Sequence, residues 1–130
     1  MQIATQLALS LDNRPGMLAL VCDALAEAKI NIYALTTSDT VDHTVIRMVV
    51  SEARRALLLL EERGTLVVES EVLLVEGKNQ PGSLAAISHQ LARAKVNIEY
   101  CYFATPPKAK KGLLVLRLSN AQKAMQVLTR

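Results

Sequence analysis

Two short, nearly identical motifs hold the residues of this 130-residue chain that could bind a ligand. Asn13-Arg14-Pro15-Gly16 recurs 66 positions later as Asn79-Gln80-Pro81-Gly82. Glycine lets a ligand approach the backbone closely, and the free N–H groups of a helix's first turn attract a carboxylate. An adjacent asparagine offers both a donor and an acceptor. The motif therefore predicts a carboxylate site, although it could also serve only as the turn that starts a helix.

Residues suited to catalysis or metal binding are scarce. There are no paired carboxylates, no Ser/His/Asp spacing and no glycine-rich phosphate loop, and neither His43 nor His89 recurs as histidine in the other half. Cys22 and Cys101 fit neither a disulfide framework nor a metal-ligand spacing, and we expect both to be small buried hydrophobes. We therefore predict a protein that is not an enzyme and holds neither a cofactor nor a metal ion.

The charge and hydropathy of the chain argue against nucleic-acid and membrane partners. Residues 1–65 carry six Lys/Arg and eight Asp/Glu, whereas residues 66–130 carry nine and four. The basic run at residues 108–111 is interpreted as a solvated hairpin tip, because the strands that would stack bases hold no aromatic residue. No signal peptide and no apolar run of about 18 residues is visible. We expect a cytoplasmic protein.

The periodicity around the two motifs predicts an α+β fold of two tandem ferredoxin-like βαββαβ units, each with an antiparallel sheet and helices on one face. In the first unit, the expected order is a strand at 3–11, a helix from Pro15, strands at 31–37 and 44–50, and a helix at 52–63 that stops at Gly64. In the second, a helix with the apolar stripe Leu84, Ile87, Leu91 and Ala94 is expected, followed by strands at 97–105 and 112–118 and a last helix from Ala121. The units span residues 1–68 and 69–130. Residues 65–77 are expected to be both the last strand of the first unit and the first strand of the second. No separate closing strand is visible for the second unit.

These motifs resemble the ACT domain, an amino-acid-sensing module attached to many enzymes of amino-acid metabolism. The resemblance rests on Asn13-Arg14-Pro15-Gly16-x-Leu18 followed by Ile30-Asn31-Ile32, and on their repeat in Asn79-Gln80-Pro81-Gly82-x-Leu84 and Val96-Asn97-Ile98. The chain is also similar to small stand-alone bacterial proteins made of two ACT units, whose second unit likewise reads Asn-Ile-Glu-Tyr-x-Tyr, as residues 97–102 do here. The resemblance covers nearly all of the chain.

The resemblance implies a ligand held between the first turn of one unit and the second strand of its neighbour. The backbone near Gly16 would hold a carboxylate and Asn31 an amino group. Tyr100 and Tyr102 either line this cavity or pack at a sheet–sheet junction. Serine-binding members often place a histidine where Leu11 and Gly77 stand here, which argues against serine. The implied ligand-binding residues are Leu11, Asp12, Asn13, Arg14, Gly16, Met17, Leu18, Asn31, Ile32, Asn79, Gln80, Gly82, Ser83, Leu84, Asn97, Ile98, Tyr100 and Tyr102.

The sequence thus predicts a regulatory protein that binds a small molecule, with an amino acid as the expected ligand, without changing it. The alternative is an ACT pair that binds no ligand and bridges protein partners, with an enzyme or a regulator as the candidate partner. We also expect a homodimer or higher oligomer. Sheet edges need covering, and Val45, Val49, Leu113 and Val115 should point away from the helices and form an apolar open face.

Overall fold

The computed structural model describes residues 1–129 and divides them into two compact units. The amino-terminal unit is Thr5–Ser70. The carboxy-terminal unit combines Met1–Ala4 with the described residues from Glu71 onward. Both boundaries fall inside long strands, β1 (Gln2–Asp12) and β4 (Val67–Lys78), so each of these strands contributes to both units.

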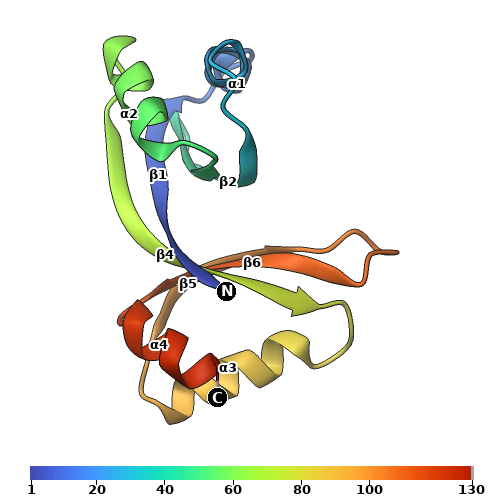
Figure 1. Cartoon of the computed structure of the whole chain (residues 1–130). Coiled ribbons are helices and arrows are strands. Elements are labelled where there is room, and N and C mark those ends of the chain that lie inside the picture. The colour runs from blue at the N-terminus through green and yellow to red at the C-terminus, as the bar shows by residue number, and fades with distance from the viewer. Residues whose placement is uncertain (130) are drawn as a thin grey trace. The chain divides into compact units, whose positions relative to one another are not determined.

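The amino-terminal unit has two helices and a four-stranded sheet (Figure 1). After β1 come α1 (Met17–Glu27), β2 (Ile32–Asp39), β3 (His43–Val50) and α2 (Ala53–Glu62), and the first part of β4 closes the unit. The sheet order is β2-β3-β1-β4, and β3 pairs antiparallel with both β1 and β2. Within this unit, buried Gln6 on β1 donates from Nε2 to Ser70 Oγ on β4 at 3.2 Å, so the polar side chain has a partner.

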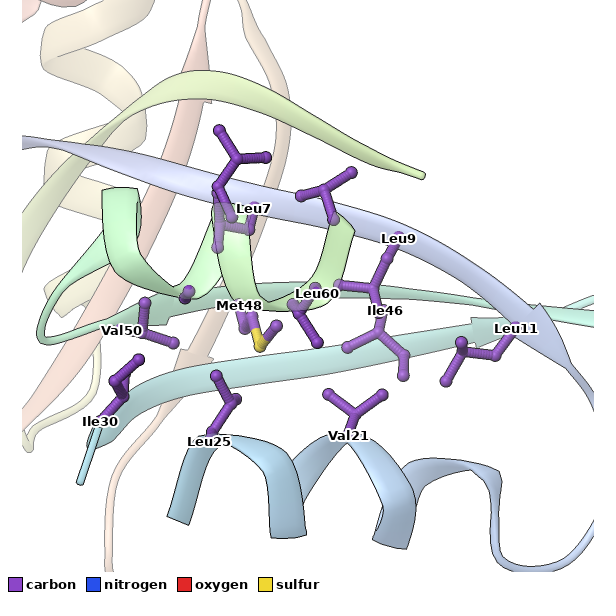
Figure 2. Packing of buried hydrophobic residues seen from close by; sticks show 13 residues of the cluster. Leu7, Leu9, Leu11, Val21, Leu25, Ile30, Ile46, Met48, Val50 and Leu60 are labelled. Atoms are coloured by element: carbon purple, nitrogen blue, oxygen red, sulfur yellow. The ribbon is translucent and has the colours of Figure 1, made fainter. Parts of the chain in front are cut away.

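The core of this unit lies between the sheet and its two helices. Figure 2 shows Val21 and Leu25 of α1 pointing toward Ile46 and Met48 of β3. These four side chains are at most 5% exposed. Their spacing follows from the sequence: residues of an amphipathic helix recur every three or four positions on one face, and those of a strand every second position.

The carboxy-terminal unit repeats this arrangement with different strands. It contains α3 (Ser83–Arg93), β5 (Ile98–Ala104), β6 (Lys111–Leu118) and α4 (Ala121–Leu128), in the sheet order β1-β4-β6-β5. Ile3, at the start of β1, packs against the core of Leu73, Leu91, Leu116 and their neighbours. The first residues of the chain therefore take the place of the fourth strand, for which residues 69–130 alone offer no segment.

The βαββαβ pattern predicted from the sequence occurs twice, and the two helices of each unit pack against each other. The ends of the strands agree with the predicted ends to within about two residues. The helix starts differ. Helices α1 and α3 begin at Met17 and Ser83, two residues after the prolines, because Gly16 and Gly82 take left-handed conformations outside the helices. No helix among the described residues is long and apolar enough to cross a membrane.

Of the four residues expected on an apolar open face, Val49 and Val115 are buried, whereas Val45 and Leu113 are partly exposed. Ile46, Met48 and Val50 face the helices as predicted. However, Val49 is only 2% exposed and Val115 only 1%, so these side chains are already buried in the single chain. Val49 and Val115 therefore give no reason to expect an oligomer. The remaining reason is the pair of terminal strands in the sheet order, β2 and β5, each of which has one unpaired edge within its unit.

Candidate functional site

The turn before α1 leaves backbone N–H groups open. Gly16 lies at φ 88°, no side chain caps the helix, and a Cβ added at Gly16 would have no atom within 4 Å. Within residues 1–129, the Met17 N–H donates to the Arg14 carbonyl at 3.4 Å, while the N–H groups of Gly16, Leu18 and Ala19 have no protein acceptor. The start of α1 therefore presents unpaired donors with free space in front of the glycine.

Asn13 ties this turn to the loop between β2 and β3. Its backbone N–H donates to the Asp42 carbonyl at 2.9 Å, and its side-chain Nδ2 donates to the Thr40 carbonyl at 3.3 Å. The carboxamide donor that the sequence suggests for a ligand is thus engaged within the protein. Arg14 Nε lies 3.8 Å from the Asp12 carboxylate, and both side chains are exposed, so the guanidinium can reach other anions.

The turn before α3 has the same backbone. Gly82 lies at φ 88°, a Cβ added there would have no atom within 4 Å, and α3 also lacks a side-chain cap. Asn79 donates from Nδ2 to the carbonyls of Pro107 at 3.1 Å and Ala109 at 2.7 Å, and its backbone N–H donates to the Lys110 carbonyl at 2.9 Å. Gln80 stands where the first turn has Arg14, so this turn lacks the guanidinium.

Asn31 and Asn97 are held by a pair of serines. The Asn31 N–H donates to Ser51 Oγ at 2.9 Å, and the Ser51 N–H donates back to the Asn31 carbonyl at 2.8 Å. Asn97 and Ser119 repeat this exchange at 2.9 and 3.0 Å. Both asparagines are exposed, and in residues 1–129 no protein atom bonds to their carboxamides. The recurrence of Ser51 as Ser119 is visible in the sequence, but its role as the anchor of these asparagines is not.

A left-handed lysine precedes each of these asparagine segments. Lys29 and Lys95 take φ 60° and 61°, two residues after the ends of α1 and α3. The Ile30 N–H donates to the Leu25 carbonyl at 2.9 Å, which closes the end of α1 in the manner usual where glycine follows a helix. Sequence reasoning missed this conformation because lysine, unlike glycine, gives no signal for it.

Two hollows adjoin the predicted residues. One, of about 250 Å³, is lined by Leu11 and Met17 together with Leu20, Leu60 and Arg63 of the two helices and their surroundings. The other is an open groove of about 440 Å³ at the end of α3. It includes Asn97 and Ile98, with Ser88 and Lys95 as its polar neighbours. Leu18 and Leu84 are exposed at the starts of their helices, and Ile32 and Ser83 are partly buried.

Strand β5 carries the remaining predicted residues. Tyr100 and Tyr102 are half-buried and lie opposite Arg117 and Val115 of β6. Cys101 is exposed, which corrects the expectation that it is a buried hydrophobe; β5 is a terminal strand of the sheet, so the thiol has no flanking strand to cover it. Cys22 is half-buried on α1.

The ring of Phe103 fills the space beside Gly77. A Cβ on Gly77 would lie 3.0 Å from Phe103 Cζ and 3.5 Å from Ser83 Oγ. The position that holds a leucine side chain in the first unit, Leu11, is thus filled in the second by an aromatic ring from β5. The two turns share a backbone but not their side-chain surroundings.

A single unit does not bring the implied donors and acceptor together. Gly16 and Asn31 flank the 11-residue helix α1, which is about 16 Å long at 1.5 Å per residue. A small amino acid cannot contact both of them. Histidines 43 and 89 are exposed, and no three His, Cys, Asp or Glu side chains among the described residues gather in a metal-binding group.

Comparison with known proteins agrees with this architecture. Protein BT0572 from Bacteroides thetaiotaomicron is 31% identical, with a TM-score of 0.90 over 98% of this chain and 87% of that chain. The ligand-free regulatory subunit of aspartate kinase from Thermus thermophilus is 20% identical, with a TM-score of 0.73 over 99% and 96%. Aspartate kinase from Synechocystis matches over 97% of this chain but 25% of its own, with 22% identity and a TM-score of 0.64. No curated protein sequence matches the chain significantly. The model of the family described as ACT domain pair matches residues 1–130, and the chain belongs to this family.

Proposed function

We propose that this ACT domain pair is a non-catalytic regulatory protein that binds a small amino acid at the turn before α1. The observation that carries the proposal is the open start of that helix, where N–H groups without a protein acceptor lie next to Gly16, whose added Cβ would meet no atom within 4 Å. A carboxylate placed there would accept from these groups and gain from the helix dipole. Arg14 adds an exposed guanidinium nearby, whose Nε lies 3.8 Å from the Asp12 carboxylate.

The ammonium group of the ligand needs an acceptor elsewhere. The Asn31 carboxamide suits this role because its backbone is held by Ser51 while its side chain is exposed and has no protein partner in the described chain. Since Gly16 and Asn31 flank the length of α1, we propose that Asn31 comes from a second copy of the chain, at an interface between ACT units. The ligand would then report on the association of copies, which is how a binding module without catalytic groups can regulate a partner.

The first turn is the better candidate of the two. It has Arg14 where the second has Gln80, so only the first of the two turns offers a guanidinium to a carboxylate. The fold itself also occurs in the regulatory subunit of an aspartate kinase, which agrees with a regulatory role.

Titration calorimetry with the common amino acids tests this proposal. If an amino acid binds, the Asn31→Ala variant should bind it more weakly than the parent by about 1–3 kcal/mol, the usual cost of leaving a buried polar partner unsatisfied. The matched control is Asn97→Ala, which removes the equivalent carboxamide from the other half and should bind like the parent. If both variants bind as the parent does, the ligand is not held by Asn31 and the site assignment is wrong.

The alternative is an ACT pair that binds no ligand and brings protein partners together. The engagement of both turn asparagines with their own hairpin loops favours it, because a turn held in this way needs no ligand to be ordered. Absence of heat with every amino acid at millimolar concentration would support this alternative and refute the sensor.

A further inference from the structure

The ends of the two units that hold these hairpin loops carry opposite charges. Asp12 at the end of β1 corresponds to Lys78 at the end of β4, 66 positions on, and Asp42 corresponds to Lys110, 68 positions on. The backbone at these positions is the same, because the carbonyls of Asp42 and Lys110 each accept the N–H of the turn asparagine at 2.9 Å. The two halves therefore share the backbone conformation at these positions but carry side chains of opposite charge.

The acidic end consists of Asp12, Asp39 and Asp42, all exposed. Asp39 lies opposite Thr44 in the β2–β3 register, next to the turn of this hairpin. Asp12 lies opposite His43 in the β1–β3 register. Arg14 is the one cation in the described chain that pairs with these carboxylates, at 3.8 Å from Asp12. Three carboxylates less one guanidinium leave a charge of −2 with His43 neutral.

The basic end consists of Lys78, Lys108, Lys110 and Lys111, also all exposed. Glu76 is the one carboxylate paired with them in residues 1–129, 3.6 Å from Lys111. Four ammonium groups less one carboxylate leave a charge of +3. Lys78 and Lys111 lie directly opposite each other in the β4–β6 register, where like charges destabilise a sheet. This end is thus not arranged for the stability of the unit.

Both charged ends are held in place. The Asn79 carboxamide donates to the carbonyls of Pro106, Pro107 and Ala109 inside the lysine loop, and the Asn13 carboxamide donates to Thr40 inside the aspartate loop. A charged loop that is already ordered loses little conformational entropy on binding. Fixed charges of opposite sign also steer association and select its register.

We propose that the acidic end of the amino-terminal unit docks against the basic end of the carboxy-terminal unit in a second copy of the chain. Every copy presents both surfaces, on the same backbone frame and with complementary charge. A nucleic acid or an acidic protein would engage the basic end alone and leave the acidic end without a role. The contact joins copies head to tail and is sensitive to salt, since the Debye length is about 30 Å at 0.01 M and about 3 Å at 1 M salt.

Charge reversal with residues taken from the other half tests this docking. The double variant Asp12→Lys with Asp42→Lys makes both ends basic, and Lys78→Asp with Lys110→Asp makes both ends acidic. Each new residue already occupies the equivalent position of the other unit, so the backbone accommodates it. We expect each variant alone to associate at least tenfold more weakly than the parent in sedimentation equilibrium at low salt. An equimolar mixture of the two should recover the association.

The control is Glu61→Lys with Glu62→Lys on α2, which changes the net charge by the same amount as the first variant and should associate like the parent. Parent protein alone provides a second measurement, because raising the salt from about 0.05 to about 0.5 M should weaken its association. The proposal is overturned if the reversed variants associate as the parent does, if their mixture shows no recovery, or if parent association ignores salt. It is also overturned if the parent stays a single copy and binds polyglutamate, which would assign the basic end to an acidic partner.

Discussion

Replacing Gly16 by alanine should impair ligand binding far more than it impairs stability. The added Cβ meets no atom within 4 Å, so the variant has no steric clash. The remaining cost is the left-handed conformation at φ 88°, which disfavours an L side chain by about 1–2 kcal/mol. Alanine also lowers the entropy of the unfolded chain, which returns about 0.4–1 kcal/mol. We expect a net loss of about 1 kcal/mol in the free energy of unfolding.

Gly82→Ala is the matched control. Gly82 has the same φ of 88° and the same free space, so the stability cost of the two substitutions should be equal. In thermal unfolding without ligand, each should lower Tm by about 2–8 °C, the range for 1 kcal/mol in domains of this size. The two variants differ only in which turn receives the methyl group.

The ligand response separates the two turns. At a ligand concentration of 100 times Kd, the parent should gain about 2.7 kcal/mol. If the methyl group blocks the approach to the Gly16 turn and weakens binding about 30-fold, the same ligand concentration adds only about 0.9 kcal/mol. Gly82→Ala should keep the full gain. If Gly16→Ala keeps the full stabilisation by ligand, or if Gly82→Ala loses as much of this stabilisation as Gly16→Ala does, the ligand does not bind at the Gly16 turn.

Four further substitutions test the packing around the sites. Gly112→Ala should cost about 1–3 kcal/mol in chemical denaturation, because its Cβ would lie 2.5 Å from the backbone carbonyl of Ala104, which cannot rotate away; an unchanged midpoint would contradict this. Lys95→Gly should stabilise by about 0.5–1 kcal/mol by relieving the left-handed lysine at φ 61°, and a loss of stability would show that the lysine side chain contributes more than its backbone costs. Gly77→Leu and Phe103→Thr should each destabilise, but the double variant should recover about 1–3 kcal/mol of their sum. It rebuilds the pair of the first unit, where Leu11 and Thr37 stand 66 positions before Gly77 and Phe103. Additive losses would refute the exchange.

The fold could be predicted from the sequence because two independent signals agreed. The period-two and helical patterns each placed elements, and the internal repeat supported every element except the closing strand with a second copy. The strand predicted at residues 44–50 is β3 (His43–Val50), and the helix predicted at 52–63 is α2 (Ala53–Glu62). Gly64 follows that helix at φ 84°, as its residue type indicated.

The details of the site were less predictable because they depend on partners distant in the sequence. The carboxamide of Asn13 donates to Thr40, 27 positions away, and no local pattern distinguishes this use from ligand binding. The fourth strand of the carboxy-terminal unit comes from Met1–Ala4, at the opposite end of the chain. Cys101 aligns with Leu35 in the repeat, which predicts a core residue, but its exposure depends on β5 being a terminal strand.

The differences between the halves occur as coupled exchanges on a conserved backbone, and this bears on which turn binds. Leu11 lies opposite Thr44 in the first unit, while Gly77 lies opposite Gly112 in the second, and Phe103 supplies the bulk that Gly77 lacks. Had the second turn simply lost its ligand site, loss of the leucine side chain would have left a cavity, and cavities in a core are costly. Because the space is refilled from the neighbouring strand, Gly77 leaves no cavity in the second unit. Both turns lack a side-chain cap and have free space at their glycine, but of the two only the first has an arginine. The two turns should therefore differ in ligand binding even though their backbones are alike.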